Sequence, residues 1–274
     1  MNARSLAFGL ATVLGVARRG FFIPYRHAAG VDPIAYPALA PLFERAQARF
    51  TGLLGEIDAL APDLLAILGG GGPARFDQTW FPRLDAAAAY AMVRRERPAR
   101  IVEVGSGHST RFLARAVADG GLATAITCID PQPRRSISGL PVTHDARLLG
   151  DDHRPLLAGL DPGDILFIDS SHLAVPGSDV DRLFLDILPR LAPGVLVHVH
   201  DVTLPDAYPA EWAWRGYNEQ LLVGALLQGG AYEILFAGHW AATRMGDRVA
   251  AGVLASLPLV PGARETSLWL RKRA

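Results

Sequence analysis

The sequence contains a single lysine, Lys272, and a single cysteine, Cys128, among its 274 residues. A Walker-type nucleotide loop needs a lysine in a glycine-rich turn, and a pyridoxal enzyme needs a lysine in its pocket, so both classes are excluded. One cysteine excludes a disulfide framework, an iron–sulfur cluster and a zinc or redox motif built on paired cysteines. Any chemistry therefore relies on carboxylates, histidines, hydroxyls or a bound cofactor.

An excess of charge of one sign is also lacking, because 27 basic side chains balance 27 acidic ones. This balance provides no field that would attract nucleic acid. Half of the residues are hydrophobic and 20% are charged, which is typical of a globular protein. The length indicates one large domain, or one domain with an appendage. The lone cysteine fits a reducing compartment, so we expect a cytoplasmic protein and leave homo-oligomerisation open.

A short apolar stretch covers residues 5–17 and is followed directly by Arg18 and Arg19. Its apolar side chains repeat at helical spacing, which predicts an amphipathic docking helix. About 13 residues are too few to cross a bilayer, which takes about 20. We therefore expect no stable membrane span. A weak signal-peptide core and contact with a membrane surface are the alternatives.

The hydrophobic pattern of the sequence changes after a glycine run at residues 69–72. Helical patterns cover residues 37–68 and 82–96. Short apolar runs then occur at 100–104, 125–130, 164–169, 194–200, 232–236 and 267–270, and helical patterns lie between them at 110–119, 153–160, 179–191 and 219–227. This alternation predicts an α/β fold with a doubly wound, mostly parallel sheet covered by helices on both faces. We predict a helical N-terminal extension over 1–74 and the α/β domain over 75–274.

Polar residues follow the ends of the predicted strands, where ligands bind in open α/β sheets. The first strand runs into Glu103-Val104-Gly105-Ser106-Gly107, and Asp130 ends the second. The two glycines allow a tight turn close to a ligand, and Ser109 or Thr110 caps the helix that follows. An acid at the position of Asp130 typically binds the ribose of a nucleotide.

A dinucleotide would need a third glycine, and Thr110 occupies that position. Glu103 beside the loop would repel a pyrophosphate but suits a ligand with a positive amino group. These residues count against an NAD(P)-dependent oxidoreductase, which is the alternative enzyme class. A non-catalytic binding module that retains the cofactor fold is a third possibility.

The set of Glu103, Gly105, Ser106, Gly107 and Asp130 resembles the cofactor site of class I S-adenosylmethionine-dependent methyltransferases. Residues 164–172 and 198–201 resemble the bacterial branch that contains antibiotic and sugar O-methyltransferases and cephalosporin hydroxylase-like proteins. The resemblance covers residues 75–274. It implies a seven-stranded Rossmann-like sheet, S-adenosyl-L-methionine as cofactor, and methylation of a small-molecule acceptor. Oxygen is favoured over nitrogen as the atom that is methylated.

The resemblance also implies roles for single residues. Gly105 and Gly107 would pass under the methionine part of the cofactor, Asp130 would hold the ribose hydroxyls, and Asp145 would lie near the adenine. The complete set of expected cofactor-binding residues is Glu103, Gly105, Ser106, Gly107, Ser109, Asp130, Asp145 and Asp169.

Four residues after the fourth and fifth expected strands are the predicted catalytic residues: Asp169, His172, His200 and Asp201. Neighbouring strands lie about 5 Å apart, so their terminal carboxylates face the same crevice. Asp169, His200 and Asp201 form a predicted metal site, whose ion would polarise a substrate hydroxyl. His200 stands where metal-dependent relatives often have an acid, which leaves Mg²⁺ open and permits Mn, Fe or Zn. In the metal-free alternative, His172 or His200 is a general base with a pKa near neutrality.

Three further features have two interpretations each. His198 shares a strand face with His200 but lies deeper, which favours a hydrogen-bonded core histidine over a ligand. Residues 201–220 form an aromatic segment that serves as a substrate lid or packs on the sheet through Trp212 and Trp214. The pair Trp80-Phe81 closes the cofactor pocket or is a hydrophobic staple.

Overall fold

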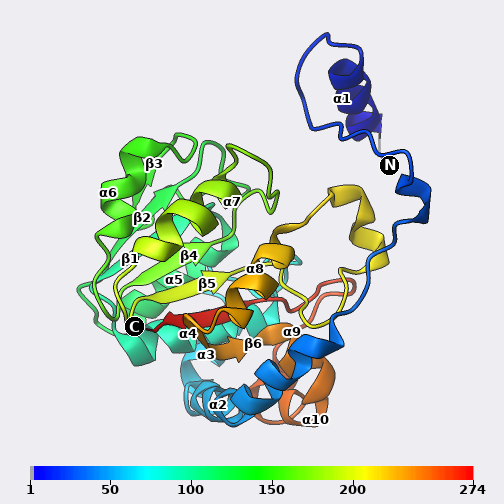
Figure 1. Cartoon of the computed structure of the whole chain (residues 1–274). Coiled ribbons are helices and arrows are strands. Elements are labelled where there is room, and N and C mark those ends of the chain that lie inside the picture. Colours follow the sequence, from blue (N-terminus) through cyan, green and yellow to red (C-terminus); the bar gives the residue numbers. More distant parts are fainter. Residues whose placement is uncertain (1–2, 274) are drawn as a thin grey trace.

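A computed structural model describes residues 3–273 and contains one seven-stranded sheet (Figure 1). Its order is β3-β2-β1-β4-β5-β7-β6. Strands β1 to β5 pair in parallel, and β7 runs antiparallel between β5 and β6. The strands are β1 (Arg100–Val104), β2 (Ala125–Ile129), β3 (Thr143–Asp145), β4 (Ile165–Ile168), β5 (Leu196–Val199), β6 (Tyr232–Ala237) and β7 (Leu268–Lys272). The predicted α/β fold with a mostly parallel Rossmann-like sheet is confirmed.

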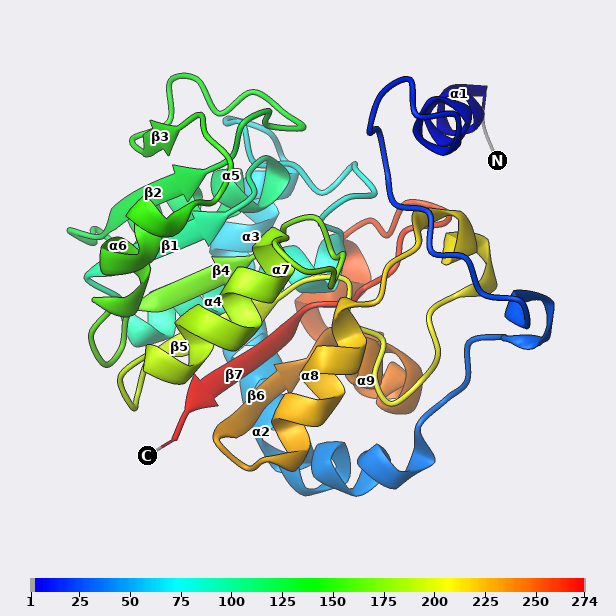
Figure 2. The ribbon, with the colours of Figure 1, turned by 45° about the horizontal axis from the view of Figure 1, so that its top comes forward.

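Helices cover both faces of this sheet, as Figure 2 shows. One face carries α2 (Ala40–Ala59), α3 (Ala61–Leu68), α4 (Arg83–Glu96) and α5 (His108–Asp119), with α4 packed on both α2 and α5. The other face carries α6 (Arg154–Ala158), α7 (Asp179–Arg182) and α8 (Glu219–Gln228). Because the central strands have no solvent-facing side, all four residues of β4 and of β5 are buried.

The predicted helix over 37–68 is broken in the structure into α2 and α3, which meet at Leu60. Pro62 lies in the first turn of α3, where it needs no hydrogen-bond partner for its nitrogen. A continuous helix would have placed this proline in its interior, where its ring clashes with the preceding turn. The pattern over 179–191 likewise divides into α7, a wider turn over Leu183–Ile187 and a 3₁₀ turn over Leu188–Arg190. Two short helices that we did not predict, α9 (Gly238–Arg244) and α10 (Gly246–Val249), follow β6.

Helix α2 packs on β6 and α4, and its side chains Phe43, Phe50 and Ile57 are buried in the same core as the sheet. The division of the chain at residue 75 therefore stays a prediction. Residues 1, 2 and 274 of the two predicted regions lie outside the described residues.

Helix α1 (Ala3–Val13) stands apart from the sheet and its helices (Figures 1 and 2). Leu10 and Leu14 are largely exposed. Within the described part of the chain, no helix is long and apolar enough to cross a membrane.

Candidate active site

The turn between β1 and α5 depends on glycine at Gly105 and Gly107. Both have positive φ angles, 95° and 153°. A Cβ atom at Gly105 would lie 1.9 Å from the carbonyl oxygen of Asp169 at the end of β4. Glycine is therefore required at Gly105 by both its conformation and its close contact with the β4 loop.

Glu103 is fully buried beneath this turn. Its carboxylate accepts hydrogen bonds from the hydroxyls of Ser109 (2.5 Å) and Thr110 (2.6 Å) and from the thiol of Cys128 (3.4 Å). Burial raises the pKa of Glu103 to about 7, and the two hydroxyl hydrogen bonds counteract part of that rise. Glu103 and Ser109 do not line the cavity described next, so in this structure Glu103 fastens the start of α5 to β1.

A cavity of about 450 Å³ opens beyond the carboxyl ends of β1, β2 and β4. Gly105, Ser106, Asp130 and Asp169 line it. The Asp130 carboxylate accepts hydrogen bonds from Ser106 Oγ and from the Gln132 backbone N–H, each 2.8 Å long. These contacts hold the carboxylate at the cavity wall. The volume of the cavity suits a nucleoside-sized ligand.

Asp145, which we expected near the adenine, does not line this cavity. Its carboxylate is held by Arg147 and by His153 Nε2, the latter at 3.1 Å. The hydrogen bonds from Arg147 lower the pKa of Asp145 far below its ordinary value, as expected for a salt-bridged carboxylate. Leu148 and Leu149, a few residues further along the chain, line the cavity instead.

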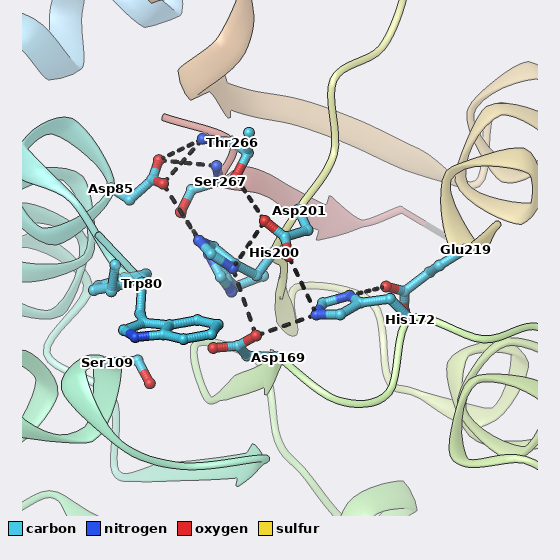
Figure 3. Close-up of polar contacts among 12 residues, drawn as sticks. Trp80, Asp85, Ser109, Asp169, His172, His200, Asp201, Glu219, Thr266 and Ser267 are labelled. Atoms are coloured by element: carbon cyan, nitrogen blue, oxygen red, sulfur yellow. Dashed lines mark hydrogen bonds and ion pairs between the residues drawn. The ribbon is translucent and has the colours of Figure 1, made fainter. Parts of the chain in front are cut away.

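The four predicted catalytic residues come together at the ends of β4 and β5 (Figure 3). His172 Nε2 lies 3.4 Å from Asp169 Oδ1 and 3.6 Å from Asp201 Oδ2. His200 Nδ1 lies 3.5 Å from Asp169 Oδ1 and 3.6 Å from Asp201 Oδ1. Each imidazole thus faces both carboxylates.

Two buried carboxylates that we did not predict contact the far nitrogens of these imidazoles (Figure 3). Glu219 Oε2 lies 2.8 Å from His172 Nδ1, and Asp85 Oδ2 lies 3.3 Å from His200 Nε2. Asp85 also accepts hydrogen bonds from the backbone N–H groups of Thr266 and Ser267, the two residues before β7. The only signal for Asp85 in the sequence is one acid beside the run of alanines at 86–89.

The carboxylates determine the charge of the two histidines. Burial opposes a charge on His172, but hydrogen bonds with Asp169 and Glu219 outweigh burial and raise its pKa well above 6.5. Burial is likewise outweighed at His200, where the charges of Asp169 and Asp201 raise the pKa well above 6.5. Burial would raise the pKa of Asp169, yet the charge of His200 and the bond to His172 hold it well below 3.8. Both imidazoles are therefore cationic near pH 7, which differs from the expected base with a pKa near neutrality.

Backbone strain is concentrated in this histidine–carboxylate cluster. Three non-glycine residues among those described have positive φ angles, and two of them are His172 (60°) and Asp201 (54°). Such conformations cost about 1–3 kcal/mol each and cluster at functional sites. The surrounding hydrogen bonds hold both residues in these conformations.

A second, small cavity of about 30 Å³ is enclosed by the histidine–carboxylate cluster and the aromatic side chains of Trp80, Phe81 and Tyr217. Ser106, Arg134 and Asp169 line both cavities, so the two adjoin. The volume corresponds to about one water molecule. In this conformation the second cavity is therefore too small for a ligand larger than water.

The structure shows which of the aromatic residues with two interpretations line a cavity. Trp80 lines the small cavity and carries Arg134 over its ring at 4.4 Å. Trp212 is buried, Trp214 is exposed, and neither lines a cavity at the site. Tyr217, from the same aromatic segment, lines the small cavity.

His198 is a core histidine, as predicted. It is fully buried, contacts Ser267 Oγ through Nε2 at 2.9 Å, and stacks on Phe167 with ring centroids 3.7 Å apart.

The predicted metal ligands Asp169, His200 and Asp201 do lie together. However, among residues 3–273 no group of three or more histidine, cysteine, aspartate or glutamate side chains is arranged to hold a metal ion. The imidazole and carboxylate atoms contact one another as ion pairs instead. The side chains as placed do not fit an ion, and metal assistance stays a prediction.

Comparisons with known proteins agree with this architecture. Residues 102–202, from β1 to the loop after β5, match the family model described as a methyltransferase domain. No curated protein has a sequence that matches this chain.

Several solved structures are similar to this chain. One is the O-methyltransferase TomG from Streptomyces achromogenes, involved in tomaymycin synthesis, in complex with S-adenosylmethionine: 19% identity, TM-score 0.44, covering 70% of this chain and 80% of that chain. Another is the O-methyltransferase from Bacillus cereus: 13% identity, TM-score 0.44, covering 81% and 91%. A third is the Podospora anserina methyltransferase PaMTH1: 14% identity, TM-score 0.42, covering 93% and 100%.

The family match covers most of the residues that line the two cavities. Residues 102–202 are similar to a methyltransferase domain, and the prediction of an S-adenosylmethionine-dependent methyltransferase is confirmed at this level.

Proposed function

We propose that this protein methylates a hydroxyl oxygen of a small molecule, with the reaction taking place where the two cavities adjoin. The observation that carries the proposal is the position of Asp169, which lines both the cofactor cavity and the small cavity. A methyl group presented from one side would meet an acceptor held on the other. S-adenosylmethionine, when bound, supplies an electrophilic methyl group on a sulfonium.

The larger cavity supplies the groups that would bind this cofactor. Asp130 is already oriented by Ser106 and Gln132 and would accept hydrogen bonds from the ribose hydroxyls. Gly105 would let the backbone approach the methionine part. Asp169 would contribute a carboxylate near the cationic end of the ligand.

The small cavity supplies the groups that would handle the acceptor proton. As the O–CH₃ bond forms and the S–CH₃ bond breaks, the electron pair of the latter stays on sulfur and the hydroxyl proton must leave. We assign Asp201 as the proton acceptor, because its carboxylate lines the small cavity and not the cofactor cavity, whereas Asp169 lines both. Cationic His172 and His200 would stabilise the developing negative charge on the acceptor oxygen.

An acceptor larger than water requires the small cavity to open. Trp80 is about half exposed and Tyr217 belongs to the aromatic segment after β5, so we assign these two side chains as the part of the wall that would open. We retain as predictions the cytoplasmic location, homo-oligomerisation, assistance by a divalent metal and the domain division at residue 75.

Calorimetric titration of the purified protein with S-adenosylmethionine, and separately with NAD, tests the proposal. We expect the sulfonium cofactor to bind and NAD not to bind. Mass spectrometry of a panel of hydroxylated compounds incubated with protein and cofactor should then reveal a methylated product. Binding of NAD alone, or of neither ligand, would contradict the proposal.

The same titration and turnover measurements, repeated after chelation, test the metal. Turnover that survives chelation supports proton transfer by the side chains alone. Loss of turnover that Mn²⁺ or Mg²⁺ restores would support the metal prediction instead.

A further inference from the structure

His108, the first residue of α5, is a buried histidine that the proposed chemistry does not use. It is only 5% exposed and lines the small cavity. Neither of its ring nitrogens has a hydrogen-bond partner among the described residues. Burying an unsatisfied polar group is costly, so native proteins rarely leave one without a purpose.

Positive charge surrounds this unsatisfied ring. Arg134 lines the same cavity, and the charges of Arg111, Arg135 and Arg75 act on His108. Arg75 pairs with Asp77, but no ion pair joins Arg111, Arg134 or Arg135 to a carboxylate within residues 3–273. Arg111 donates to backbone carbonyls and Arg134 lies over Trp80, so three guanidinium groups near one neutral, unsatisfied imidazole have no carboxylate among the described residues to balance their charge.

The ring is neutral because burial, together with these arginine charges, lowers the pKa of His108 to about 4. A neutral imidazole has one N–H to donate. The start of α5 adds the positive end of a twelve-residue helix. Each of these groups favours a negatively charged ligand.

The small cavity is lined by His108 and Arg134 as well as by the histidine–carboxylate cluster that contains Asp169 and Asp201. A hydroxyl beside Asp201 would meet the proton acceptor, whereas an anionic group would be favoured beside His108 and Arg134, which have no carboxylate partner within the described chain.

We propose that the acceptor carries a carboxylate or phosphate group, which His108 and Arg134 bind while the hydroxyl to be methylated faces Asp201. This inference rests on the proposed methyltransferase function and names the class of its acceptor. The aromatic wall of Trp80, Phe81 and Tyr217 favours a flat carbon skeleton between the two polar groups.

Calorimetry on protein saturated with S-adenosylhomocysteine tests the inference, with benzoate and benzamide as probes of the same shape that differ in charge. We expect benzoate to bind and benzamide to bind at least about tenfold more weakly, because hydrogen bonds to a charged group are the strong ones. Arg134→Gln and His108→Leu should each weaken benzoate binding about tenfold. Arg134 is exposed, so its variant keeps the test valid if the buried substitution disturbs folding.

Arg45→Gln is the matched control, because Arg45 is also exposed and makes no ion pair within the described chain, but it lies on α2 away from both cavities. It should leave benzoate binding unchanged. Equal binding of the two probes, or binding of neither, would overturn the inference. A tenfold loss of S-adenosylhomocysteine affinity in both cavity variants would also overturn it, because the anion would then be the carboxylate of the cofactor. Absence of cofactor binding to the unmodified protein would instead count against the proposed function.

A different observation carries a second inference, about the segment of residues 3–31. The sequence has no acidic residue before Asp32, whereas Arg18, Arg19 and Arg26 fall within the segment. Leu14, Val16, Phe22 and Ile23 are each at least 65% exposed. Apolar side chains flanked only by cations are typical of segments that lie on a membrane surface.

We infer that this segment lies on an anionic lipid surface, with its apolar side chains in the interface and its arginines at the headgroups. Charge complementarity favours lipid over a second copy of the chain, since two copies would bring like charges together. Phe21, in the same segment, lines the cofactor cavity. Membrane contact would therefore occur beside the site.

Sedimentation with vesicles of phosphatidylglycerol or of phosphatidylcholine tests this inference. Binding should occur to the anionic vesicles and fall at least about tenfold in Arg18→Gln/Arg19→Gln and in Phe22→Ser/Ile23→Ser, because both charge and apolar area contribute. Arg45→Gln again serves as control. Equal sedimentation with both lipids, no sedimentation, or a lipid-free dimer that Phe22→Ser/Ile23→Ser dissociates would overturn the inference.

Discussion

Asp85 in α4 and His200 after β5 lie 3.3 Å apart, although 115 residues separate them in the sequence. The same carboxylate accepts hydrogen bonds from the backbone of Thr266 and Ser267. One buried acid thus connects a helix, the loop after β5 and the segment just before β7. His172 has a corresponding partner in Glu219.

Replacing Asp85 with asparagine should lower kcat at least about tenfold while leaving the affinity for S-adenosylmethionine nearly unchanged. Asparagine has nearly the same shape and can still accept from the backbone just before β7, but it removes the negative charge that faces cationic His200. Steady-state kinetics and calorimetry on the same preparations give the two values. Asp119→Asn, at the far end of α5, is a control of the same chemistry that should change neither value.

Asp201→Asn should abolish measurable turnover, a loss of about 10²–10⁴-fold, because an amide cannot accept the acceptor proton. Affinity for S-adenosylmethionine should change little. Single-turnover measurements with saturating cofactor would detect the loss. Turnover close to that of the unmodified protein would remove Asp201 from the mechanism.

Asp130→Ala and Asp145→Ala should differ sharply in cofactor affinity. Asp130 lines the cofactor cavity, so its removal should weaken S-adenosylmethionine binding about tenfold or more, as expected for hydrogen bonds to a charged group. Asp145 faces Arg147 and His153 instead, and its removal should have a much smaller effect. If calorimetry found the same large loss of cofactor affinity in both variants, Asp145 would belong to the cofactor site after all.

Gly105→Ala should destabilise the protein by about 3 kcal/mol or more, because it combines a positive φ with a backbone overlap. Gly139→Ala is the matched control, since Gly139 also has a positive φ (80°) but an added Cβ there would meet nothing within 4 Å. It should cost only about 1–2 kcal/mol. Urea unfolding of both variants isolates the contribution of the contact with Asp169.

Glu103 should make the stability of the protein depend on pH. Its pKa is raised from 4.5 to about 7 in the folded state, so the folded state binds the extra proton between these values. The contribution of this group is therefore fully present below pH 4.5 and is lost as the pH rises through about 7.

The glutamine of Glu103→Gln cannot titrate, so its contribution to the unfolding free energy does not depend on pH. From pH 4.5 to pH 8 the unmodified protein should therefore lose up to about 3 kcal/mol of unfolding free energy relative to this variant. Urea unfolding at several pH values gives this difference. A difference that stays constant with pH would show that Glu103 keeps an ordinary pKa.

Much of the site follows from the sequence because side chains at the ends of parallel strands must meet at one edge of the sheet. Asp130, Asp169, His172, His200 and Asp201 could be placed in this way. The apolar character of the strands also predicted helices on both faces. These inferences depend only on local periodicity and on the handedness of βαβ units.

The supporting residues could not be placed in the same way. Asp85 and Glu219 come from helices, and which helical side chain reaches a strand end depends on how each helix packs on the sheet. The charge of the histidines was also not predictable, because it depends on those two carboxylates as well as on the strand-end pair. Nothing in the sequence singles out His108, and its missing partners are visible only in three dimensions.

The contact between Gly105 and the backbone of Asp169 has a consequence for the order of events at the site. The loop that borders the cofactor cavity cannot move toward β4 without displacing the residue that separates the two cavities. A ligand in one cavity that displaced this backbone contact would change the width of the other cavity. By thermodynamic reciprocity, the proposed cofactor and acceptor would then each change the affinity of the protein for the other.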